Sequence, residues 1–329
     1  MMNVALIGLG SVGKGVAGML AQKDLGIAIT GIADSKSGCM DPGGLDIAGL
    51  LANKTKRGYC GDQEISASDV IRKADYDALI EVTPTNAVTG EPAIGYIKAA
   101  LLRKKHVVTS NKGPIALAYK ELHALAVKKG VALRYEATVA GAIPIMHTLE
   151  HGLAGNEILA LYGVLNGTCN YILTRMAAEG LTYEQALLEA REMGYAEADP
   201  TYDVQGIDAA IKLVILANTI WGNGIRLNDV DRTGIDLLTP DAMRLADDEG
   251  CTIRLIAEAI PRKHILRVSP RIIEKNHPLV VEGTLNALTL ETDMAKEITL
   301  IGRGAGSIET ASAIIGDLLF IKDRYVQRA

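Results

Sequence analysis

The first 137 residues contain two kinds of hydrophobic pattern: short apolar runs and longer amphipathic stretches. Short apolar runs rich in β-branched residues predict strands at residues 3–7, 27–33, 78–82, 106–109 and 131–135. Amphipathic stretches between the runs predict helices near residues 12–21, 90–104 and 115–129. Strands that alternate with helices indicate an α/β fold with a doubly wound, mostly parallel sheet.

The pattern changes outside these elements. Residues 35–61 are rich in Gly, Asp and Lys and predict a surface excursion that carries a short helix around residues 45–54. Further on come long helical segments and then alternating segments, at residues 182–193, 204–220, 267–273 and 285–290. We therefore expect a first domain at residues 1–137, to which a helix in residues 305–329 returns, and a second, α+β domain at residues 138–304.

Composition and charge exclude several classes of protein. With 329 residues, 48% of them hydrophobic, the chain can build one large or two ordinary domains and is not disordered. The net charge of -5 and the lack of a basic run argue against a nucleic-acid partner. Four scattered cysteines without a C-x-x-C pair argue against a disulfide framework and favour a reducing cytoplasm. The longest uncharged run, residues 158–174, is broken by glycines and asparagines, so no membrane span is predicted.

A glycine-rich turn joins the first predicted strand to the first predicted helix. It reads Gly8, Leu9, Gly10, Ser11, Val12 and Gly13. Such glycines allow a tight turn, close approach of a pyrophosphate to the backbone and tight helix packing, as in Rossmann-type domains. Asp34 follows the next strand, where its carboxylate would bind an adenosine ribose and favour NAD over NADP. Lys36, two residues later, would weaken this preference for NAD. The alternative is a glycine turn in an unrelated α/β fold.

Polar residues also follow the later strands of this sheet. In a doubly wound sheet the ligand lies beyond the carboxyl ends of the strands, so residues 83–86, 110–114 and 136–138 are expected to face the nicotinamide. Lys112 is a single cation beside glycine and proline, where it could touch cofactor or substrate. The alternative is a solvated surface lysine.

A second candidate site lies in residues 194–212. The loop at its start carries three acids and two tyrosines, and the helix that follows carries Asp208 and Lys212 at i and i+4, on one face. A carboxylate and an ammonium held in a cleft could bind the charged groups of an amino acid and supply a proton. The alternative is an ordinary surface ion pair.

Two further patterns have their own alternatives. His147 and His151 with Glu150 match an H-x-x-E-H zinc motif, but no third ligand is evident. Cys169 could be the nucleophile of an aldehyde-oxidising enzyme, although such a cysteine is more often a small buried residue. A dinucleotide sensor without catalysis also stays open.

Taken together, these segments resemble the homoserine dehydrogenase family over nearly the whole chain. The matching stretches are residues 8–13, 83–86, 111–114, 135–144, 165–171, 194–212 and 302–306. The segment from Glu197 to Lys212 is the most specific of them. The resemblance implies reversible, NAD(P)-dependent interconversion of L-aspartate 4-semialdehyde and L-homoserine, a step toward threonine, methionine and isoleucine.

The resemblance also implies roles for matched positions. The substrate would be bound by Glu197, Asp208, Tyr195 and Asp203. The cofactor would be bound by Gly8, Gly10, Ser11, Val12, Gly13, Asp34, Thr83, Lys112 and Gly304. Lys212 would be the acid/base donor at the substrate carbonyl, with Asp208 beside it, and Lys112 would hold the substrate or share the proton transfer. Because the oxygen gains charge as hydride reaches carbon, an ammonium there both stabilises that charge and delivers the proton.

Three further expectations come from the resemblance. A monovalent cation, sodium, would be held by the backbone carbonyls of Glu136, Val139, Gly141 and Ile143. The second domain would form a homodimer. Since the chain ends soon after its last glycine turn, we expect no regulatory extension and no feedback inhibition by threonine through one.

Overall fold

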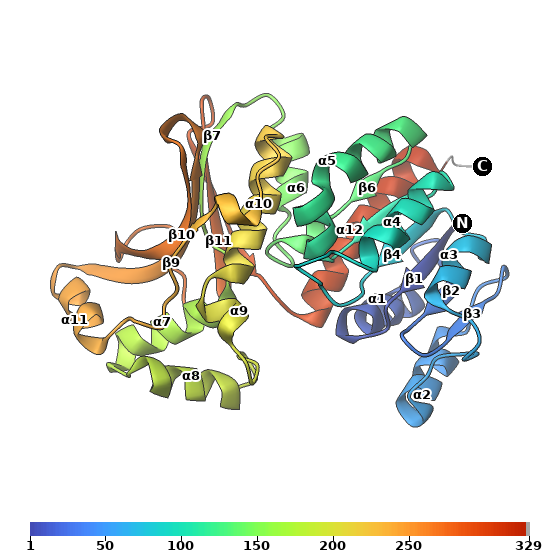
Figure 1. Cartoon of the computed structure of the whole chain (residues 1–329), viewed down its shortest axis with the longest axis horizontal. Helices are drawn as coiled ribbons and strands as arrows, with labels where there is room; N and C mark the ends of the chain where they lie inside the picture. The colour runs from blue at the N-terminus through green and yellow to red at the C-terminus, as the bar shows by residue number, and fades with distance from the viewer. Residues whose placement is uncertain (327–329) are drawn as a thin grey trace. The chain divides into compact units, whose positions relative to one another are not determined.

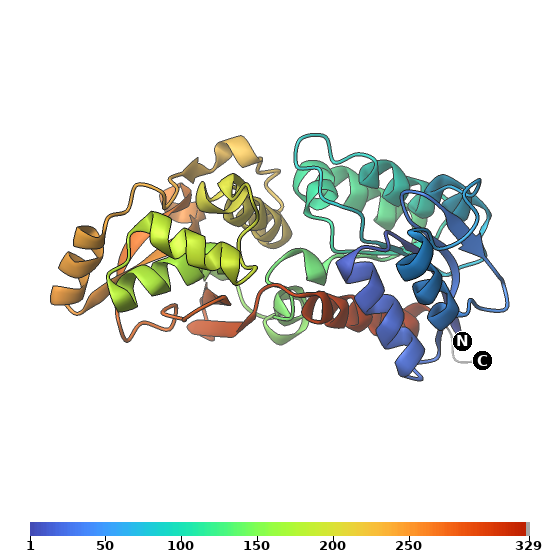
Figure 2. The same ribbon diagram turned by 90° about the horizontal axis from the view of Figure 1, so that it is seen from below.

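The computed structural model describes residues 1–326, which form two compact units. The first unit comprises residues 1–142 and the segment from Gly306 onward, and the second comprises residues 143–305. Figures 1 and 2 show the elements of each unit from two directions. Each unit is built on a six-stranded sheet.

The first sheet has the strand order β3-β2-β1-β4-β5-β6. Its strands are β1 (Met2–Ile7), β2 (Ile27–Ala33), β3 (Gly38–Met40), β4 (Ala78–Glu81), β5 (His106–Thr109) and β6 (Leu133–Arg134). All neighbouring strands run parallel except β2 and β3. This is the strand order of a Rossmann-type doubly wound sheet, so the predicted fold class is confirmed.

Helices cover both faces of this sheet, which explains why nearly every residue of β1 is buried. The helices are α1 (Ser11–Gln22), α2 (Ile47–Arg57), α3 (Ala67–Lys73), α4 (Ala93–Leu102), α5 (Lys112–Lys129) and α12 (Ser307–Tyr325). The core on one face joins α1, α2 and α12 to the strands. Helices α3, α4 and α5 pack in sequence on the other face.

The expectation for residues 35–61 was wrong in one respect. The segment contains α2, close to the helix expected there, but it also adds β3 to the edge of the sheet, antiparallel to β2. Gly38 in β3 also bridges Asp62, and a Cβ on Gly61 would lie 2.3 Å from the Gly38 carbonyl oxygen. Strand β3 has only three residues, too few for a periodic pattern, and its bridge to Asp62 joins residues that are 24 positions apart, so local periodicity reveals neither.

The second sheet has the order β12-β11-β7-β9-β10-β8 and is antiparallel except between β8 and β10. Its strands are β7 (Ile158–Val164), β8 (Asp231–Arg232), β9 (Cys251–Ile260), β10 (Ile265–Glu274), β11 (Leu285–Thr292) and β12 (Glu297–Arg303). Only β10 and β11 were expected, because β9 is buried almost throughout and lacks the alternation of a half-exposed strand. Strands and helices in one unit confirm the α+β class.

Four of the α-helices of this unit, α6, α7, α9 and α10, carry candidate residues. The six are α6 (Ile145–His147), α7 (Gly167–Glu179), α8 (Tyr183–Glu192), α9 (Thr201–Val204), α10 (Ile207–Trp221) and α11 (Pro240–Asp248). The single helix expected at residues 204–220 is divided into α9 and α10, because Gly206 between them has a left-handed φ of 72°. Within residues 1–326, no helix is both long and apolar enough to cross a membrane.

Helix α12 is tied to the first sheet by buried polar contacts. Asp317 is fully buried and accepts hydrogen bonds from Arg134 Nε and from the backbone N–H of Glu136, both at 3.0 Å. At the other end of the helix, Ser307 Oγ donates to the backbone oxygen of Ser11 at 2.6 Å. The last helix of the chain is therefore part of the first unit.

Removal of the Asp317 carboxylate is expected to destabilise the first unit. Asp317→Ala leaves the partly buried Arg134 guanidinium and a buried backbone N–H without this acceptor. Removing one partner of a fully buried pair costs about 3–5 kcal/mol, so a loss of about 2–4 kcal/mol is expected here. Asp323→Ala, an exposed aspartate on the same helix, is the matched control and is expected to change stability by less than about 0.5 kcal/mol. Urea unfolding measures both, and equal stability of the two variants would contradict this role.

Candidate functional site

The glycine turn after β1 leaves an open space beside the start of α1. A Cβ on Gly8 (φ 103°) would lie 2.6 Å from the Val82 oxygen, and one on Gly13 would lie 2.0 Å from the Gly8 oxygen, so both positions require glycine. Beside Gly10, in contrast, nothing lies within 4 Å of an added Cβ. Gly10 begins α1 without a side-chain cap, which leaves N–H groups of the first turn for an anion. With Ser11 and Val12 in that turn, this geometry fits a pyrophosphate.

The carboxylate of Asp34, after β2, is held by four donors. These are the backbone N–H groups of Lys36 (2.7 Å) and Ser37 (2.8 Å), the Ser37 hydroxyl (3.2 Å) and Lys54 Nζ (2.5 Å). Burial would raise the pKa of Asp34, but the hydrogen bonds from Lys54 and the Lys36 backbone outweigh it and hold the pKa below its usual value. The sequence did not reveal Lys54, because it follows Asp34 by twenty residues on α2.

The carboxyl ends of β4 and β5 bring Thr83 and Lys112 to one edge of the sheet. Lys112 is the first residue of α5, and Asn111 caps the helix by accepting the Gly113 N–H at 3.2 Å. The Asn111 side-chain amide also donates to the backbone oxygen of Thr83 at 3.1 Å. Two of the three loops expected to face the nicotinamide are thus joined to each other.

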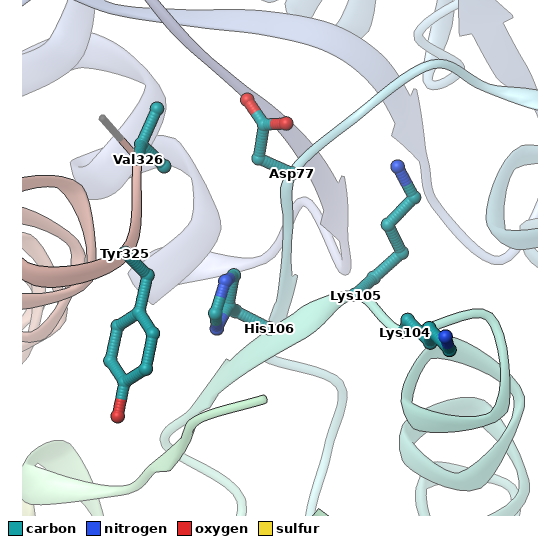
Figure 3. Close-up of a pocket in the computed structure, with 6 residues that line it drawn as sticks. All are labelled: Asp77, Lys104, Lys105, His106, Tyr325 and Val326. Carbon is teal, nitrogen blue, oxygen red and sulfur yellow. The ribbon is translucent and has the colours of Figure 1, made fainter. Parts of the chain in front are cut away.

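A cavity of about 390 Å³ lies at the opposite edge of this sheet. Figure 3 shows its lining residues, Asp77, Lys104, Lys105, His106, Tyr325 and Val326. They precede or begin β4 and β5 or end α12, whereas every predicted cofactor residue of this unit lies at the carboxyl edge. This cavity is therefore separate from the candidate site.

Lys212 and Asp208 form a buried ion pair on α10. Their whole-residue exposures are 8% and 4%, and Lys212 Nζ lies 2.7 Å from Asp208 Oδ2. The same ammonium donates to the backbone oxygen of Leu165 at 2.7 Å. A pair withdrawn from water in this way differs from the surface ion pair that the sequence left as an alternative.

Asn166 links this pair to a second acid. Its side-chain amide donates to Asp208 Oδ2 at 3.0 Å and to Asp203 Oδ1 at 2.6 Å. Burial raises the pKa of Asp203, and the nearby Asp208 carboxylate raises it further, against the lowering effect of the Asn166 hydrogen bond. The carboxylates of the cluster can bind a cationic amine, and the Lys212 ammonium can donate a hydrogen bond to an oxygen.

The structure does not gather every predicted substrate residue into this cluster. Tyr195 is 41% exposed, and its backbone oxygen accepts the Thr168 hydroxyl at 2.8 Å, beside the start of α7. Glu197 is exposed in the same loop, and among residues 1–326 it is not in hydrogen-bond contact with Asp208 or Lys212. These two residues are therefore exposed to solvent and are not part of the buried cluster.

Gly304 lies beside an amide that the sequence did not single out. Asn286 on β11 is 1% exposed, and neither its nitrogen nor its oxygen has a hydrogen-bond partner among the described residues. A Cβ on Gly304 would overlap this amide at 2.1 Å. Glycine at this position is thus required by packing within the second unit.

The segment proposed to bind a cation has an unusual backbone. Ala140 and Gly141 have consecutive left-handed φ values of 56° and 53°. Two consecutive residues in this region form a tight local bend, and the donors that the segment offers are its backbone carbonyl oxygens. Hard oxygen donors of this kind suit an alkali cation.

The remaining patterns have structural settings. Cys169 is fully buried, its thiol lies 3.2 Å from the Asp203 backbone oxygen, and burial raises its pKa well above the usual value, which opposes a nucleophilic thiolate. The rings of His147 and His151 lie 5.9 Å apart, but in the described part of the chain no group of three His, Cys, Asp or Glu side chains is arranged to hold a metal. Within the described residues, this geometry supports neither a nucleophilic Cys169 nor a zinc site at His147 and His151.

Comparison with known proteins agrees over both units. The family model for the homoserine dehydrogenase NAD binding domain matches residues 8–136, and the model for homoserine dehydrogenase matches residues 144–319. The homoserine dehydrogenase of Methanocaldococcus jannaschii is 46% identical over 97% of this chain and 98% of its own length. The NAD(+)-dependent homoserine dehydrogenase of Pseudomonas canavaninivorans is 37% identical over 97% of this chain and 96% of its own length.

A solved structure is also similar. The homoserine dehydrogenase of Thiobacillus denitrificans superimposes with a TM-score of 0.87 at 33% identity, over 99% of this chain and 74% of that chain. Both family models, both relatives and this solved structure are described as homoserine dehydrogenase. This chain therefore belongs to the homoserine dehydrogenases, NAD(P)-dependent oxidoreductases that act on a CH-OH group.

Proposed function

We propose that the Lys212–Asp208 pair is the centre at which this chain interconverts L-homoserine and L-aspartate 4-semialdehyde. The observation that carries the proposal is an ammonium and a carboxylate 2.7 Å apart, both nearly fully buried, on one helix. Bound NAD(P) supplies or accepts the hydride. The side chains of the protein bind the amino acid and move one proton at its oxygen.

Lys212 is suited to act at that oxygen. An ammonium has three N–H donors, and within the described residues Lys212 directs two of them to Leu165 and Asp208. The third is assigned to the substrate oxygen, where it stabilises the charge that develops during reduction and delivers the proton. Asp208 holds the ammonium in place and carries the balancing charge.

The acids around this pair are assigned to the substrate amine. Asp208 and Asp203 share the Asn166 amide, so their carboxylates face a common point. Tyr195 and Glu197, on the exposed loop beside α7, are assigned to the solvent side of the bound amino acid. Together they supply more negative than positive charge, as a cationic amine requires.

The residues assigned to the cofactor belong to two groups. The turn containing Gly8, Gly10 and Gly13 is assigned to the pyrophosphate, since only Gly10 has open space beside it. Thr83 and Lys112, at the carboxyl ends of β4 and β5, are assigned to the nicotinamide side together with Gly304. Lys112 would then hold the substrate or share the proton transfer.

The Asp34–Lys54 pair is assigned to the adenosine ribose and allows both NAD and NADP. Asp34 alone would repel a 2′-phosphate, but Lys54 Nζ at 2.5 Å offsets its charge. Lys36, two residues after Asp34, adds a second cation nearby. We therefore expect the enzyme to accept both cofactors.

Three finer assignments complete the proposal. The carbonyls of Glu136, Val139, Gly141 and Ile143 are assigned to sodium, supported by the left-handed turn at Ala140 and Gly141. A homodimer formed through the second unit is expected, and light scattering that reports a monomer would reject it. The cytoplasm is proposed as the compartment, in keeping with four free cysteines.

The overall reaction is tested by nicotinamide absorbance with L-homoserine, with NAD and NADP offered separately in sodium and in potassium buffers. Lys212→Ala is expected to lower kcat by about 10²–10⁴-fold, because the proton donor is lost. Cys169→Ser is the matched control in the same cluster and is expected to retain kcat. Both variants must keep their circular dichroism and cofactor binding. Full turnover by Lys212→Ala, or loss only in Cys169→Ser, would reject the assignment.

Asp203→Asn is expected to raise stability and weaken substrate binding. Because the folded-state pKa of Asp203 is raised above 3.8, the native protein binds this proton more tightly than the unfolded chain. That stability is present at low pH and is lost as pH rises through the folded pKa. At neutral pH the variant should therefore be at least as stable as the parent in urea, and the two should converge in acid, while KM for homoserine rises. A less stable variant at neutral pH would contradict the sign.

Lys54→Ala is expected to shift the cofactor preference toward NAD. The variant leaves the Asp34 charge without its partner and removes a cation from the ribose site, so kcat/KM with NADP should fall by about 10–100-fold, as for loss of one charge-assisted hydrogen bond. With NAD the change should stay within about threefold. Lys36→Ala is the comparison that shows which lysine dominates. Equal losses with both cofactors would assign Lys54 to stability alone.

A further inference from the structure

Glu81, the last residue of β4, is a fully buried carboxyl group at the carboxyl edge of the first sheet. One of its oxygens accepts the backbone N–H of Thr83 at 2.9 Å and the Thr83 hydroxyl at 2.5 Å. The other oxygen accepts the Thr109 hydroxyl at 2.9 Å. Glu81 therefore joins the ends of β4 and β5.

These contacts fix the direction of the next hydrogen bonds. Each hydroxyl has a single hydrogen, and each gives it to Glu81, so each must accept on its other side. Thr109 Oγ1 accepts the backbone N–H of Asn111 at 3.0 Å. Thr83 Oγ1 accepts the Asn111 side-chain amide at 3.3 Å. Glu81 thereby orients Asn111 through two separate routes.

Asn111 in turn sets the start of α5. Its side-chain oxygen accepts the Gly113 N–H, and a Cβ on Gly113 would lie 2.5 Å from the Asn86 oxygen, so Gly113 is packed against the loop after β4. Lys112 lies between Asn111 and Gly113. The backbone on both sides of Lys112 is thus fixed by the network that begins at Glu81.

Stability does not explain a carboxyl group at this position. The other residues of β4 are Ala78, Leu79 and Ile80, all fully buried and apolar. Burial raises the pKa of Glu81, against hydrogen bonds that lower it, so this group is held at a cost. An apolar residue in place of a buried charged group is often neutral or stabilising. The carboxyl must serve the geometry around it.

We propose that Glu81 is the positioning residue for Lys112, acting through Thr83, Thr109 and Asn111. The proposal rests on the assigned role of Lys112 at the cofactor and substrate. A carboxylate accepts from both hydroxyls at once, whereas a glutamine can accept with its oxygen alone. In Glu81→Gln one threonine hydroxyl loses its acceptor, and the orientation of Asn111 is no longer unique.

A double-mutant cycle tests the proposal. Glu81→Gln is expected to lower kcat by about tenfold, as for one lost hydrogen bond. In a Lys112→Ala background the same substitution should change the residual kcat by less than about twofold, because its effect passes through Lys112. Thr109→Val is a second variant that removes only one hydroxyl of the network, and it should show the same non-additivity. It keeps the test open if Glu81→Gln does not fold.

Asp77→Asn is the matched control. Asp77 also ties two strands of this sheet, since it accepts the backbone N–H of Asn3 at 2.8 Å, but it lies at the opposite edge, beside the cavity of Figure 3. This variant should lower the melting temperature and leave kcat unchanged. A purely structural Glu81 would behave in the same way.

The outcomes separate two failures. If Lys112→Ala retains full turnover, the assigned role of Lys112 fails, whatever Glu81 does. If Lys112→Ala loses turnover but the losses of the two substitutions multiply, Glu81 does not act through Lys112 and the inference is overturned. Multiplied losses for Thr109→Val as well would exclude the whole network.

Discussion

A carboxylate that leaves water must regain hydrogen bonds or a counter-charge, or its burial costs several kcal/mol. Asp317, Glu81 and Asp208 are each less than 5% exposed, and each regains donors from a different element of the fold. Asp317 connects α12 to the first sheet, and Glu81 connects the ends of β4 and β5. Asp208 connects α10 to Asn166, which follows β7. The same constraint thus governs a structural tie at Asp317, a connection between strand ends at Glu81 and a candidate-site residue at Asp208.

The cluster of Asp203, Asp208 and Lys212, proposed as the substrate site, shows the energetic cost of burying several charges together. Asp203 and Asp208 share one amide donor, and burial raises the pKa of Asp203. A core selected for stability alone would not hold two acids and an ammonium so close together. A site that must receive a substrate amine and a substrate oxygen needs this charge in place before the substrate arrives. Local instability is the consequence of that preorganisation.

The sequence predicted features that depend on local spacing and missed those that depend on distant pairing. The glycine turn, Asp34 and the i, i+4 pair of Asp208 and Lys212 can be recognised from neighbours in the chain. Lys54 could not be recognised, because its contact with Asp34 exists only once α2 packs beside β2. Strand β7 was missed for the same reason, since it pairs with β9 and β11, which lie far along the chain. Strand β9 was missed because it is buried almost throughout and lacks the alternation of a half-exposed strand. Glu81 was hidden because it ends an apolar run that reads as an ordinary strand.

The two lysines of the proposed centre are held in different ways, and the difference suits two roles. Lys212 is held through its own ammonium, which contacts Asp208 and the Leu165 oxygen, so its charged group is the part that is fixed. The network from Glu81 instead acts on the backbone that carries Lys112, through two neutral hydroxyls and an amide. A direct contact with a carboxylate would stabilise the charged form of a lysine, whereas a path through neutral groups fixes position with little effect on charge. The fold therefore fixes the backbone that carries Lys112 through neutral groups, whereas it fixes Lys212 at the charged group itself.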